Sequence, residues 1–570
     1  MKNKNHKTDL CIIGGGLAGT CAAIAAARQG VRVVLMQDRP VLGGNASSEI
    51  RMWICGAHGE NMRETGILEE LQLENLYRNP EANFSLWDSI LYEKVKAEEN
   101  ITLLLNCSCV NCEMDGSKIS SVKGWQLTSE TWHTVAAKYF ADCSGDSVLA
   151  PLSGAEYRIG REAQAEFNEG AGQSTADKKT MGLSILLQVR ETDSQKKFIP
   201  PSFAYKYETH DDFPYKDHFW RNHDTETNFW WIEYGGEKDS IHDTEEIKDE
   251  LIKIAYGIWD HMKNHGNHGV ENWILEWIGF LPGKRESRRY VGDYIMTQND
   301  IASHGKFEDI IAYGGWTMDD HPPGGFYHDG PPTVHHPAPS PFGIPYRAIY
   351  SRNIDNLFFA GRNISVSHIA LSATRVMATC ALLGQAVGTA AAIALSNNTM
   401  PRSVDICALQ NKLIYDDCYL PFIKREPAEL TQKAKTVTEI LKNGHDRPIA
   451  SNENIYTGEI GVPITYEFAD KVNISATRII FDSDLNRNLP NMPCSYPLNM
   501  QARHVPETIT KAFVIETSDD GKNFVEVYRI ENNYQRLVQI ELNCFAKFIR
   551  LTPTKTWGTP KARIFSWDVV

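Results

Sequence analysis

The fold is decided by the stretch Asp9-Leu10-Cys11-Ile12-Ile13-Gly14-Gly15-Gly16-Leu17-Ala18-Gly19. This stretch joins an apolar strand to a glycine loop and the start of a helix. Residues 9–13 predict a strand, 20–29 an Ala-rich helix, and 31–36 a second strand. In this context G-x-G-x-x-G predicts a dinucleotide site: Gly14 permits a tight turn, Gly16 a close approach to pyrophosphate, and Gly19 close helix packing. Leu17 and Ala18 belong to the same predicted site, since a helix N-terminus favours an anion.

The predicted ribose contact stays open between two neighbouring residues. A carboxylate usually ends the second strand of this motif and binds ribose hydroxyls. Here Gln37 stands at that position and Asp38 follows it. Gln37 can hydrogen-bond a hydroxyl without carrying charge, so both residues are included in the predicted site.

Three segments later in the chain also carry glycine together with polar or charged residues. They are GGN at 43–45, FADCSGD at 140–146 and NLFFAGR at 356–362, the last followed by a helix expected around 371–394. Convergence of such separated segments on one cofactor is typical of FAD folds of the glutathione-reductase type, whereas an NAD dehydrogenase needs little beyond the first loop. The remaining predicted cofactor residues are Arg39, Gly43, Gly44, Asn45, Ser47, Arg51, Gly145, Asp146, Gly361, Arg362 and Arg375.

Residues about 9–400 resemble the FAD-dependent oxidoreductase family related to fumarate reductase flavoproteins and the flavin subunit of heterodisulfide reductase. The resemblance is carried by VLGGNASSEIRMW at 41–53, GKRESRR at 283–289, IPYR at 344–347 and AGR at 360–362. It implies bound FAD and redox chemistry and leaves the substrate open. The chain lacks a Cys-x4-Cys pair beside the first helix and a second G-x-G-x-x-G, which disfavours a pyridine-nucleotide disulfide reductase. It also lacks an iron–sulfur cysteine run.

The 570 residues predict an α/β protein of several domains. We expect a Rossmann-like FAD-binding domain in two parts, 1–154 and 336–400, with an α+β substrate or cap domain inserted at 155–335. A helical connector covers 401–450. Short alternating strands then predict a β-sandwich at 451–570. Residues 515–524 resemble the galactose-binding-like, discoidin-type sandwich, a fold that binds sugars in some proteins and serves packing or dimerisation in others.

The formal charge is 58 − 72 = −14, which disfavours nucleic acid and anionic membrane partners. The N-terminus lacks the apolar stretch of a signal peptide, so we expect a cytoplasmic protein with reduced thiols. The apolar stretch 378–395 is interrupted by glycines and predicts a buried helix rather than a membrane span. Cys107, Cys109 and Cys112 are predicted to be strand residues rather than zinc ligands, and no metal is expected. The sequence leaves the oligomeric state open, with a homo-oligomer as one alternative.

Histidine and tryptophan are concentrated in the predicted insertion. Twelve of 18 His lie between His210 and His336, and seven of 13 Trp lie between Trp220 and Trp316. Aromatic faces beside hydrogen-bonding groups, as in 219–220 and 228–231, suit a polyhydroxylated ring, although they suit the core of a small cap domain equally well. Trp273 and Trp277 are spaced i, i+4, which predicts one face of a core helix.

Removing a hydride from a carbon that bears a hydroxyl group requires a base for the hydroxyl proton, and histidine suits that task. Three histidines lie in segments expected to face the flavin: His58, His321 and His368. Arg347 completes the predicted catalytic set. Cys55 is expected to be a packing residue rather than a redox thiol. A substrate carboxylate, the cofactor phosphates, the reduced flavin or ion pairing could each use the arginines Arg51, Arg285, Arg288, Arg347 and Arg375.

These features predict an FAD-dependent oxidoreductase that transfers a hydride between flavin and a small polar substrate, with a sugar or other hydroxy compound as the leading class. The electron acceptor is left open. A fumarate-reductase-like C=C reductase or dehydrogenase of a carboxylate is the alternative enzyme. A carbohydrate-binding protein with a structural flavin is an alternative of another class, and the acidic charge disfavours a flavin-dependent RNA-modifying protein.

Overall fold

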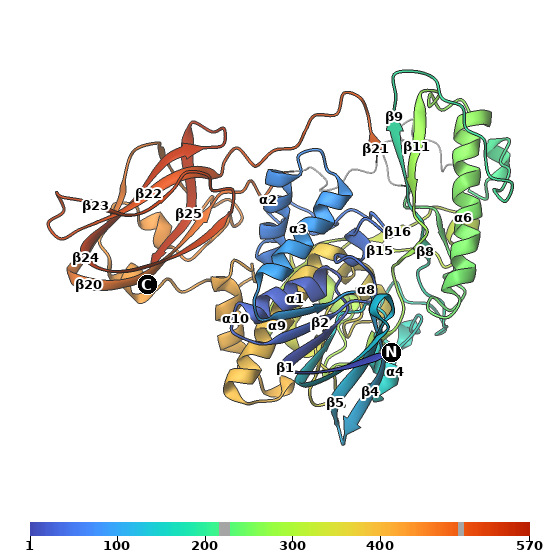
Figure 1. Ribbon diagram of the computed structural model, residues 1–570, viewed down its shortest axis with the longest axis horizontal. Coiled ribbons are helices and arrows are strands. Elements are labelled where there is room, and N and C mark those ends of the chain that lie inside the picture. Colours follow the sequence, from blue (N-terminus) through green and yellow to red (C-terminus); the bar gives the residue numbers. More distant parts are fainter. Residues whose placement is uncertain (216–228, 488–494) are drawn as a thin grey trace. The chain divides into compact units, whose positions relative to one another are not determined.

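The computed structural model describes residues 1–215, 229–487 and 495–570 (Figure 1). Contacts divide the chain into two compact units, the first of residues 1–57, 82–409 and 490–502, the second of 58–81, 410–489 and 503–570. The predicted boundaries at 154 and 335 fall inside the first unit, so they stay predictions.

A seven-stranded sheet forms the centre of the first unit. Its order is β3-β2-β1-β6-β5-β4, with β18 paired to the end of β6. β1, β2, β3, β6 and β18 run parallel, while β4 and β5 are antiparallel additions at one edge. The strands are β1 (Lys2–Ile13), β2 (Val33–Met36), β3 (Ile101–Leu104), β4 (Cys107–Asp115), β5 (Lys118–Gln126), β6 (Thr131–Asp142) and β18 (Leu357–Phe359).

Helices cover the parallel strands, so the strand residues beneath them are buried without alternation. All four residues of β2 are buried, as are the last four of β1. Helix α1 (Leu17–Ala27) lies against helix α9 (Met377–Asn397), as Figure 1 shows. Small residues bring the two backbones together: a Cβ on Gly384 would lie 2.0 Å from the Ala18 carbonyl oxygen, and one on Gly388 would lie 2.2 Å from that of Ala22.

The apolar stretch predicted as a buried helix is confirmed as one. Helix α9 has the length and composition of a membrane span, yet 89% of its most apolar window is buried inside the protein. The helix predicted around 371–394 is in fact two helices, α8 (His368–Thr374) and α9, because Val376 takes an extended conformation between them. This break turns the chain at Arg375. The three strand cysteines lie on β4, as predicted.

The inserted region combines helix α6 (Thr244–Asp260) with small sheets, and its core includes Trp259 and Phe229. One sheet has the order β10-β8-β12 and another β11-β9-β21. These strands are β8 (Leu183–Ser184), β9 (Leu187–Glu191), β10 (Glu233–Tyr234), β11 (Trp273–Ile278), β12 (Gly283–Lys284) and β21 (Ser495–Tyr496). Residues 216–228, which include Trp220 and part of the aromatic run, lie outside the described residues.

The helix predicted for Trp273 and Trp277 is wrong, because both residues lie on strand β11, antiparallel to β9. A bulge between Leu275 and Trp277 shifts the register, so the four-residue spacing has no helical meaning. Short runs rich in aromatic and β-branched residues favour strands, and periodicity alone does not distinguish the two. Trp273 is buried, whereas Trp277 is half-buried under the Arg51 guanidinium.

The described part of the chain has further helices and three further pairs of short strands. The helices are α2 (Ile67–Arg78), α3 (Phe84–Ala97), α4 (Leu149–Ser153), α5 (Gln164–Phe167), α7 (Gln298–Ala302), α10 (Ile406–Tyr415) and α11 (Glu429–Lys433). The paired strands are β7 (Tyr157–Arg158) with β13 (Arg289–Tyr290), β14 (Ile310–Gly314) with β17 (Phe342–Pro345), and β15 (Met318–Asp320) with β16 (Val334–His336).

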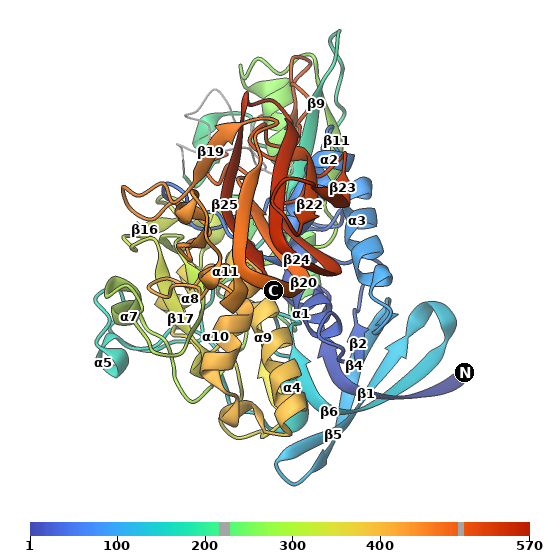
Figure 2. The ribbon, with the colours of Figure 1, turned by 90° about the vertical axis from the view of Figure 1, so that its left-hand side faces the viewer.

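The second unit contains the predicted β-sandwich-like region, a six-stranded sheet of order β19-β25-β20-β24-β22-β23 (Figure 2). Its two longest strands carry bulges, which bend and twist a strand. Tyr466 and Trp567 stack inside its core with ring centroids 4.3 Å apart. The strands are β19 (Tyr456–Glu459), β20 (Ile464–Phe481), β22 (Thr510–Ser518), β23 (Val525–Ile530), β24 (Leu537–Thr556) and β25 (Lys561–Val569).

Gly384→Ala should destabilise the protein by about 1–3 kcal/mol, because the added methyl group overpacks the contact between α9 and α1. In an exposed helix the same change stabilises, since alanine is the better helix former. The sign of the change in free energy of unfolding therefore tests the contact. Ser396→Ala, at the exposed end of α9, is the control and should leave stability nearly unchanged.

Candidate functional site

The first glycine loop has the close contacts that its motif predicts. Gly14 has φ +98°, and a Cβ there would lie 2.5 Å from the carbonyl carbon of Cys143. A Cβ on Gly19 would lie 1.8 Å from the Gly14 carbonyl oxygen. The end of β1, the end of β6 and the start of α1 therefore meet through backbone atoms, with Leu17 and Ala18 buried in the first helical turn.

The second glycine loop lies directly against the first. The Gly43 amide donates to the Gly15 carbonyl over 2.8 Å, and a Cβ on Gly44 would lie 3.1 Å from the Gly16 Cα. Gly43 and Gly44 both have positive φ, which glycine adopts without strain. Gly16 caps α1 without a side-chain hydrogen bond, so the first amides of that helix can bind an anion.

The side chains of the two candidate ribose residues differ in burial and in the hydrogen bonds they already make. Gln37 is buried, and its amide accepts from the Gly15 N–H over 2.7 Å and donates to the Val41 carbonyl over 3.1 Å. Gln37 therefore braces the glycine loop. The Asp38 side chain is 61% exposed and lies 3.7 Å from Arg39. The geometry favours Asp38 for a ribose contact.

Residues after the second glycine loop connect it to the insertion. Ser47 donates to the Gly44 carbonyl over 2.7 Å and holds the loop. Arg51 has positive φ and donates from Nη1 to Gln188 of β9. Arg39 Nη1 lies 3.7 Å from Glu49 Oε2, and in the described part of the chain both atoms are buried without a hydrogen-bond partner.

A chain of polar contacts brings the other predicted segments together. Asn45 donates to the Lys284 carbonyl over 3.1 Å, and Lys284 pairs with Asp146 at 2.8 Å. Asp146 also pairs with Arg362 at 2.7 Å, and Gly145 makes room for that guanidinium. Burial alone would raise the pKa of Asp146, but the charges of Arg362 and Lys284 lower it below its usual range. Gly361, with φ +115°, approaches the start of α1 at Ala18.

These residues fit a bound dinucleotide. The glycine loops form a cradle that any side chain would narrow, and helix amides open onto it. Two of the buried donors that have no hydrogen-bond partner among the described residues are Nε of Arg362 and Oγ1 of Thr379. Thr379 lies in the first turn of α9. Such donors suit the phosphate and ring oxygens of a dinucleotide.

His321 is held between two carboxylates in the same unit. Its Nδ1 lies 2.8 Å from Glu233 Oε2, and its Nε2 lies 3.4 Å from Asp319 Oδ2. Arg285 pairs with Glu233 at 3.1 Å, and Arg375 pairs with Asp319 at 3.3 Å. Burial would raise the pKa of Asp319, but the His321 hydrogen bond and the Arg375 charge lower it well below its usual range.

His368 is held by a different pair of acids, with both ring nitrogens at hydrogen-bond distance. Its Nδ1 lies 2.9 Å from Glu286 Oε2, and its Nε2 lies 3.1 Å from Asp320 Oδ1. Burial would lower the pKa of His368, but Glu286 and Asp320 raise it to about 10. The ring is therefore a cation at neutral pH, which suits electrostatic stabilisation better than proton abstraction.

The other predicted catalytic residues are placed elsewhere. Arg347 pairs with Asp309 at 3.0 Å and lies over the Tyr294 ring. His58 is exposed and belongs to the second unit. The Cys55 thiol accepts a hydrogen bond from Trp53 Nε1, and the Cys55 carbonyl accepts one from the Ala378 amide of α9. The structure therefore brings His321 and His368 to one strand, β15, and leaves Arg347 and His58 outside that group.

A pocket of about 550 Å³ opens beside the same strand. Asp320, Pro322 and Pro323 line it, so it reaches both chain neighbours of His321. Its charged lining includes Arg161, which pairs with Asp177, and Lys179, which pairs with Glu237. The remaining lining residues are Glu237, Gly324, Tyr327, His328, Asp329 and Val334.

A model of the FAD dependent oxidoreductase family matches residues 9–413, well over half of the chain. The chain belongs to this family. The protein is therefore an FAD-dependent oxidoreductase, and the loops described above carry the motif expected to hold FAD. No curated protein matches the sequence.

Several solved structures have distant similarity to parts of this oxidoreductase. A geranylgeranyl bacteriochlorophyll reductase-like protein from Thermoplasma acidophilum is 12% identical, covers 73% of this chain and 85% of its own, and has a TM-score of 0.31. The myxobacterial FAD-dependent halogenase CndH is 15% identical, and the match covers 34% of this chain and 46% of the CndH chain, with a TM-score of 0.23. A family 32 carbohydrate-binding module of Streptococcus pneumoniae EndoD is 15% identical, and the match covers 24% of this chain and 94% of the module, with a TM-score of 0.19.

Sequence reasoning missed the four acids that hold the two histidines, namely Glu233, Glu286, Asp319 and Asp320. Asp319 and Asp320 directly precede His321, and Glu286 lies within the family-like segment 283–289, so three of them had a local signal. Glu233 had none, because it lies on a separate strand, β10, 88 residues before His321.

Gly16→Val should weaken FAD binding by about 10-fold or more, equivalent to about 1.4 kcal/mol, because the side chain would enter the cradle facing Gly44. The measurement is flavin absorbance per chain during FAD titration of the stripped protein. Gly116→Asn is the control, since it keeps a left-handed turn residue with open space around it. Full FAD affinity in the valine variant would contradict this assignment.

The raised pKa of His368 predicts a pH-dependent contribution to stability. A folded-state pKa of about 10 against an ordinary value of 6.5 stabilises the fold fully below pH 6.5. That contribution is lost as pH rises toward about 10. The difference in free energy of unfolding between the wild type and His368→Gln should therefore shrink across this range in urea titrations. A constant difference would show that the ring is not a buried cation.

Proposed function

We propose that this oxidoreductase oxidises a small, neutral hydroxy compound, with a sugar or related polyol as the substrate class. When bound, FAD supplies the acceptor for the hydride that leaves the hydroxyl-bearing carbon. The observation that carries the proposal is His321, a buried imidazole whose Nδ1 is held by Glu233 at 2.8 Å while its Nε2 lies 3.4 Å from Asp319, next in sequence to residues that line a pocket.

His321 is placed to take the proton that such an oxidation releases. The carbon loses a hydride, its hydroxyl group loses a proton, and a carbonyl group remains. Glu233 accepts a hydrogen bond from Nδ1 and orients the ring. Nε2 lies 3.4 Å from Asp319, longer than a typical N–H···O hydrogen bond, so its lone pair can take the proton, and the two carboxylates stabilise the positive charge that the ring then carries. Arg375 and Arg285 in turn hold those carboxylates in place.

The charges around the pocket favour a neutral substrate. Arg161 and Lys179 line the pocket, but each already pairs with a carboxylate, Asp177 or Glu237. Of the arginines that could clamp a substrate acid, Arg285, Arg347 and Arg375 are ion-paired in the same way. Hydroxyl groups can hydrogen-bond to Asp320 and Tyr327 without displacing any of these pairs.

The finer kinship with fumarate reductase flavoproteins, and with it a C=C reduction of a carboxylate, is the competing proposal. Three further proposals are sugar binding by the second unit, a cytoplasmic location and assembly into homo-oligomers. The identity of the electron acceptor is left open. Anaerobic mixing with panels of sugars, hydroxy acids and dicarboxylic acids separates the two enzyme proposals. Bleaching of the flavin by neutral hydroxy compounds supports the first, and bleaching by carboxylates alone supports the second.

His321→Gln should slow flavin reduction by about 10²–10⁴-fold, because glutamine cannot accept the proton. FAD content should be unchanged, since His321 does not belong to the glycine cradle. Stopped-flow absorbance under anaerobic conditions gives the rate with the substrate that bleaches the wild type. His242→Gln removes another histidine bound to a carboxylate, at the exposed surface of the insertion, and serves as the control. An unchanged rate in His321→Gln would remove it from the base role.

A further inference from the structure

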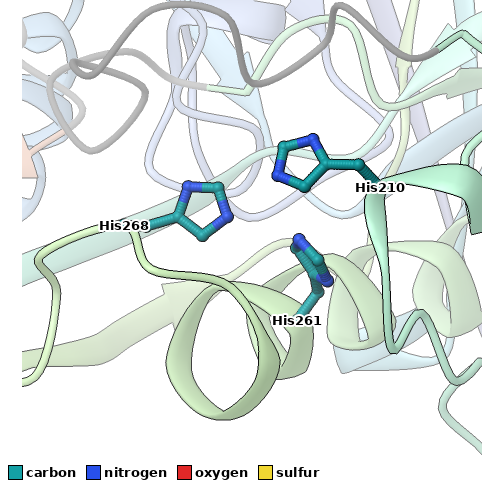
Figure 3. Close-up of side chains that lie close together, drawn as sticks. All are labelled: His210, His261 and His268. Carbon is teal, nitrogen blue, oxygen red and sulfur yellow. The ribbon is translucent and has the colours of Figure 1, made fainter.

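Three histidines of the insertion turn their rings toward one another (Figure 3). His210 begins the short turn His210–Asp212, His261 follows the last residue of α6, and His268 lies in the loop beyond. One ring nitrogen from each lies within 4.8 Å of the other two. The ring centroids are 5.2–5.7 Å apart. This group is separate from the carboxylate-bound histidines of the redox site.

The backbone around His261 fixes how its ring is presented. A single π-helical turn, His261–His265, ends the helix, a feature that often marks functional sites. His261 Nδ1 lies 2.7 Å from the Tyr207 carbonyl oxygen, and a carbonyl only accepts, so Nδ1 carries the proton. The lone pair of Nε2 is thereby directed away from Tyr207. This is the arrangement in which a carbonyl orients a metal-binding imidazole.

Gly266 keeps open the space where two of the rings meet. A Cβ on Gly266 would lie 2.2 Å from His268 Nε2 and 3.0 Å from His261 Nε2. Both Nε2 atoms therefore lie on the side of Gly266 that a Cβ would occupy, and a larger residue at 266 would displace the His268 ring. His261 is buried, His268 is half-buried and His210 is exposed, so the cluster is open to solvent at His210.

The two less exposed rings, His261 and His268, are in the protonation state that metal binding requires. Burial and the neighbouring histidines lower the pKa of His261, and the same two causes lower that of His268 to about 4. At neutral pH both rings are therefore neutral, and a neutral imidazole offers a lone pair to a metal ion.

We propose that His210, His261 and His268 bind one divalent transition-metal ion, with zinc as the ion that fits best. Imidazole suits zinc, and three protein ligands leave a fourth position for water or another ligand. In a tetrahedral zinc site the ligand nitrogens lie about 3.3 Å apart. The present spread of up to 4.8 Å closes if His210, on its exposed three-residue turn, moves inward.

A bound ion would stabilise one wall of the pocket beside β15. Phe213, three residues after His210, packs against His261 with ring centroids 5.0 Å apart and against Phe326 at 6.3 Å. Phe326 precedes Tyr327, which lines the pocket. The metal would tie the His210 turn to the end of α6 behind this aromatic layer. The inference does not rest on the proposed hydroxy-compound chemistry.

The test is zinc binding by the untagged, FAD-loaded full chain. Isothermal titration calorimetry with zinc, after chelation and dialysis, should give one tight site in the wild type. His210→Ala and His268→Ala should each weaken this site by about 100-fold or more, because each removes a direct ligand. His242→Ala, at an exposed histidine of the same region, should bind zinc as the wild type does. Zinc should also raise Tm in the wild type and not in the two ligand variants.

Two results would overturn the proposal. The first is a wild type that shows no tight zinc site. The second is a site whose affinity and stoichiometry are the same in His210→Ala, His268→Ala and His242→Ala, which would place the bound zinc elsewhere on the chain. Circular dichroism of each variant verifies that it folds, and a variant that fails to fold is replaced by His210→Gln or His268→Gln.

Discussion

Two helices meet at a separation that only glycine permits, and the cofactor site depends on that contact. Gly384 and Gly388 of α9 lie against carbonyl oxygens of α1, while Gly19 of α1 lies against the end of β1. The N-terminus of α1 is thereby fixed over the carboxyl edge of the parallel strands. Gly361, at the end of β18, approaches the same turn of α1, so the late segment of the chain reaches the early one.

A second constraint is the alternation of side chains along β15. Asp319 and Asp320 are consecutive, so they point to opposite faces of the strand. One binds His321 and the other His368. Each histidine is completed by a glutamate from another element, Glu233 or Glu286. Because buried charges are costly unless paired, removing any one acid should destabilise the group, since it leaves the histidine with a single carboxylate.

Local signals in the sequence were enough for the parallel sheet, the glycine loops and the strands of the second unit, because each rests on neighbouring residues. Position 37 shows where such signals end: the motif predicts a ribose contact there, yet Gln37 is spent on bracing the loop. The strand at Trp273 and the break at Val376 depend on partners distant in sequence. The histidine–acid pairs and the three-histidine cluster could not be predicted, since each requires the tertiary fold.

The short strand β21 has a consequence for how this protein can be divided. Although residues 490–502 come late in the chain, they belong to the first unit, where Ser495 and Tyr496 pair in parallel with β9. The chain passes between the two units five times, at 57/58, 81/82, 409/410, 489/490 and 502/503. No single cut therefore releases either unit whole. The tail therefore contributes a strand to the first unit, and a fragment that ends before residue 490 would lack that strand.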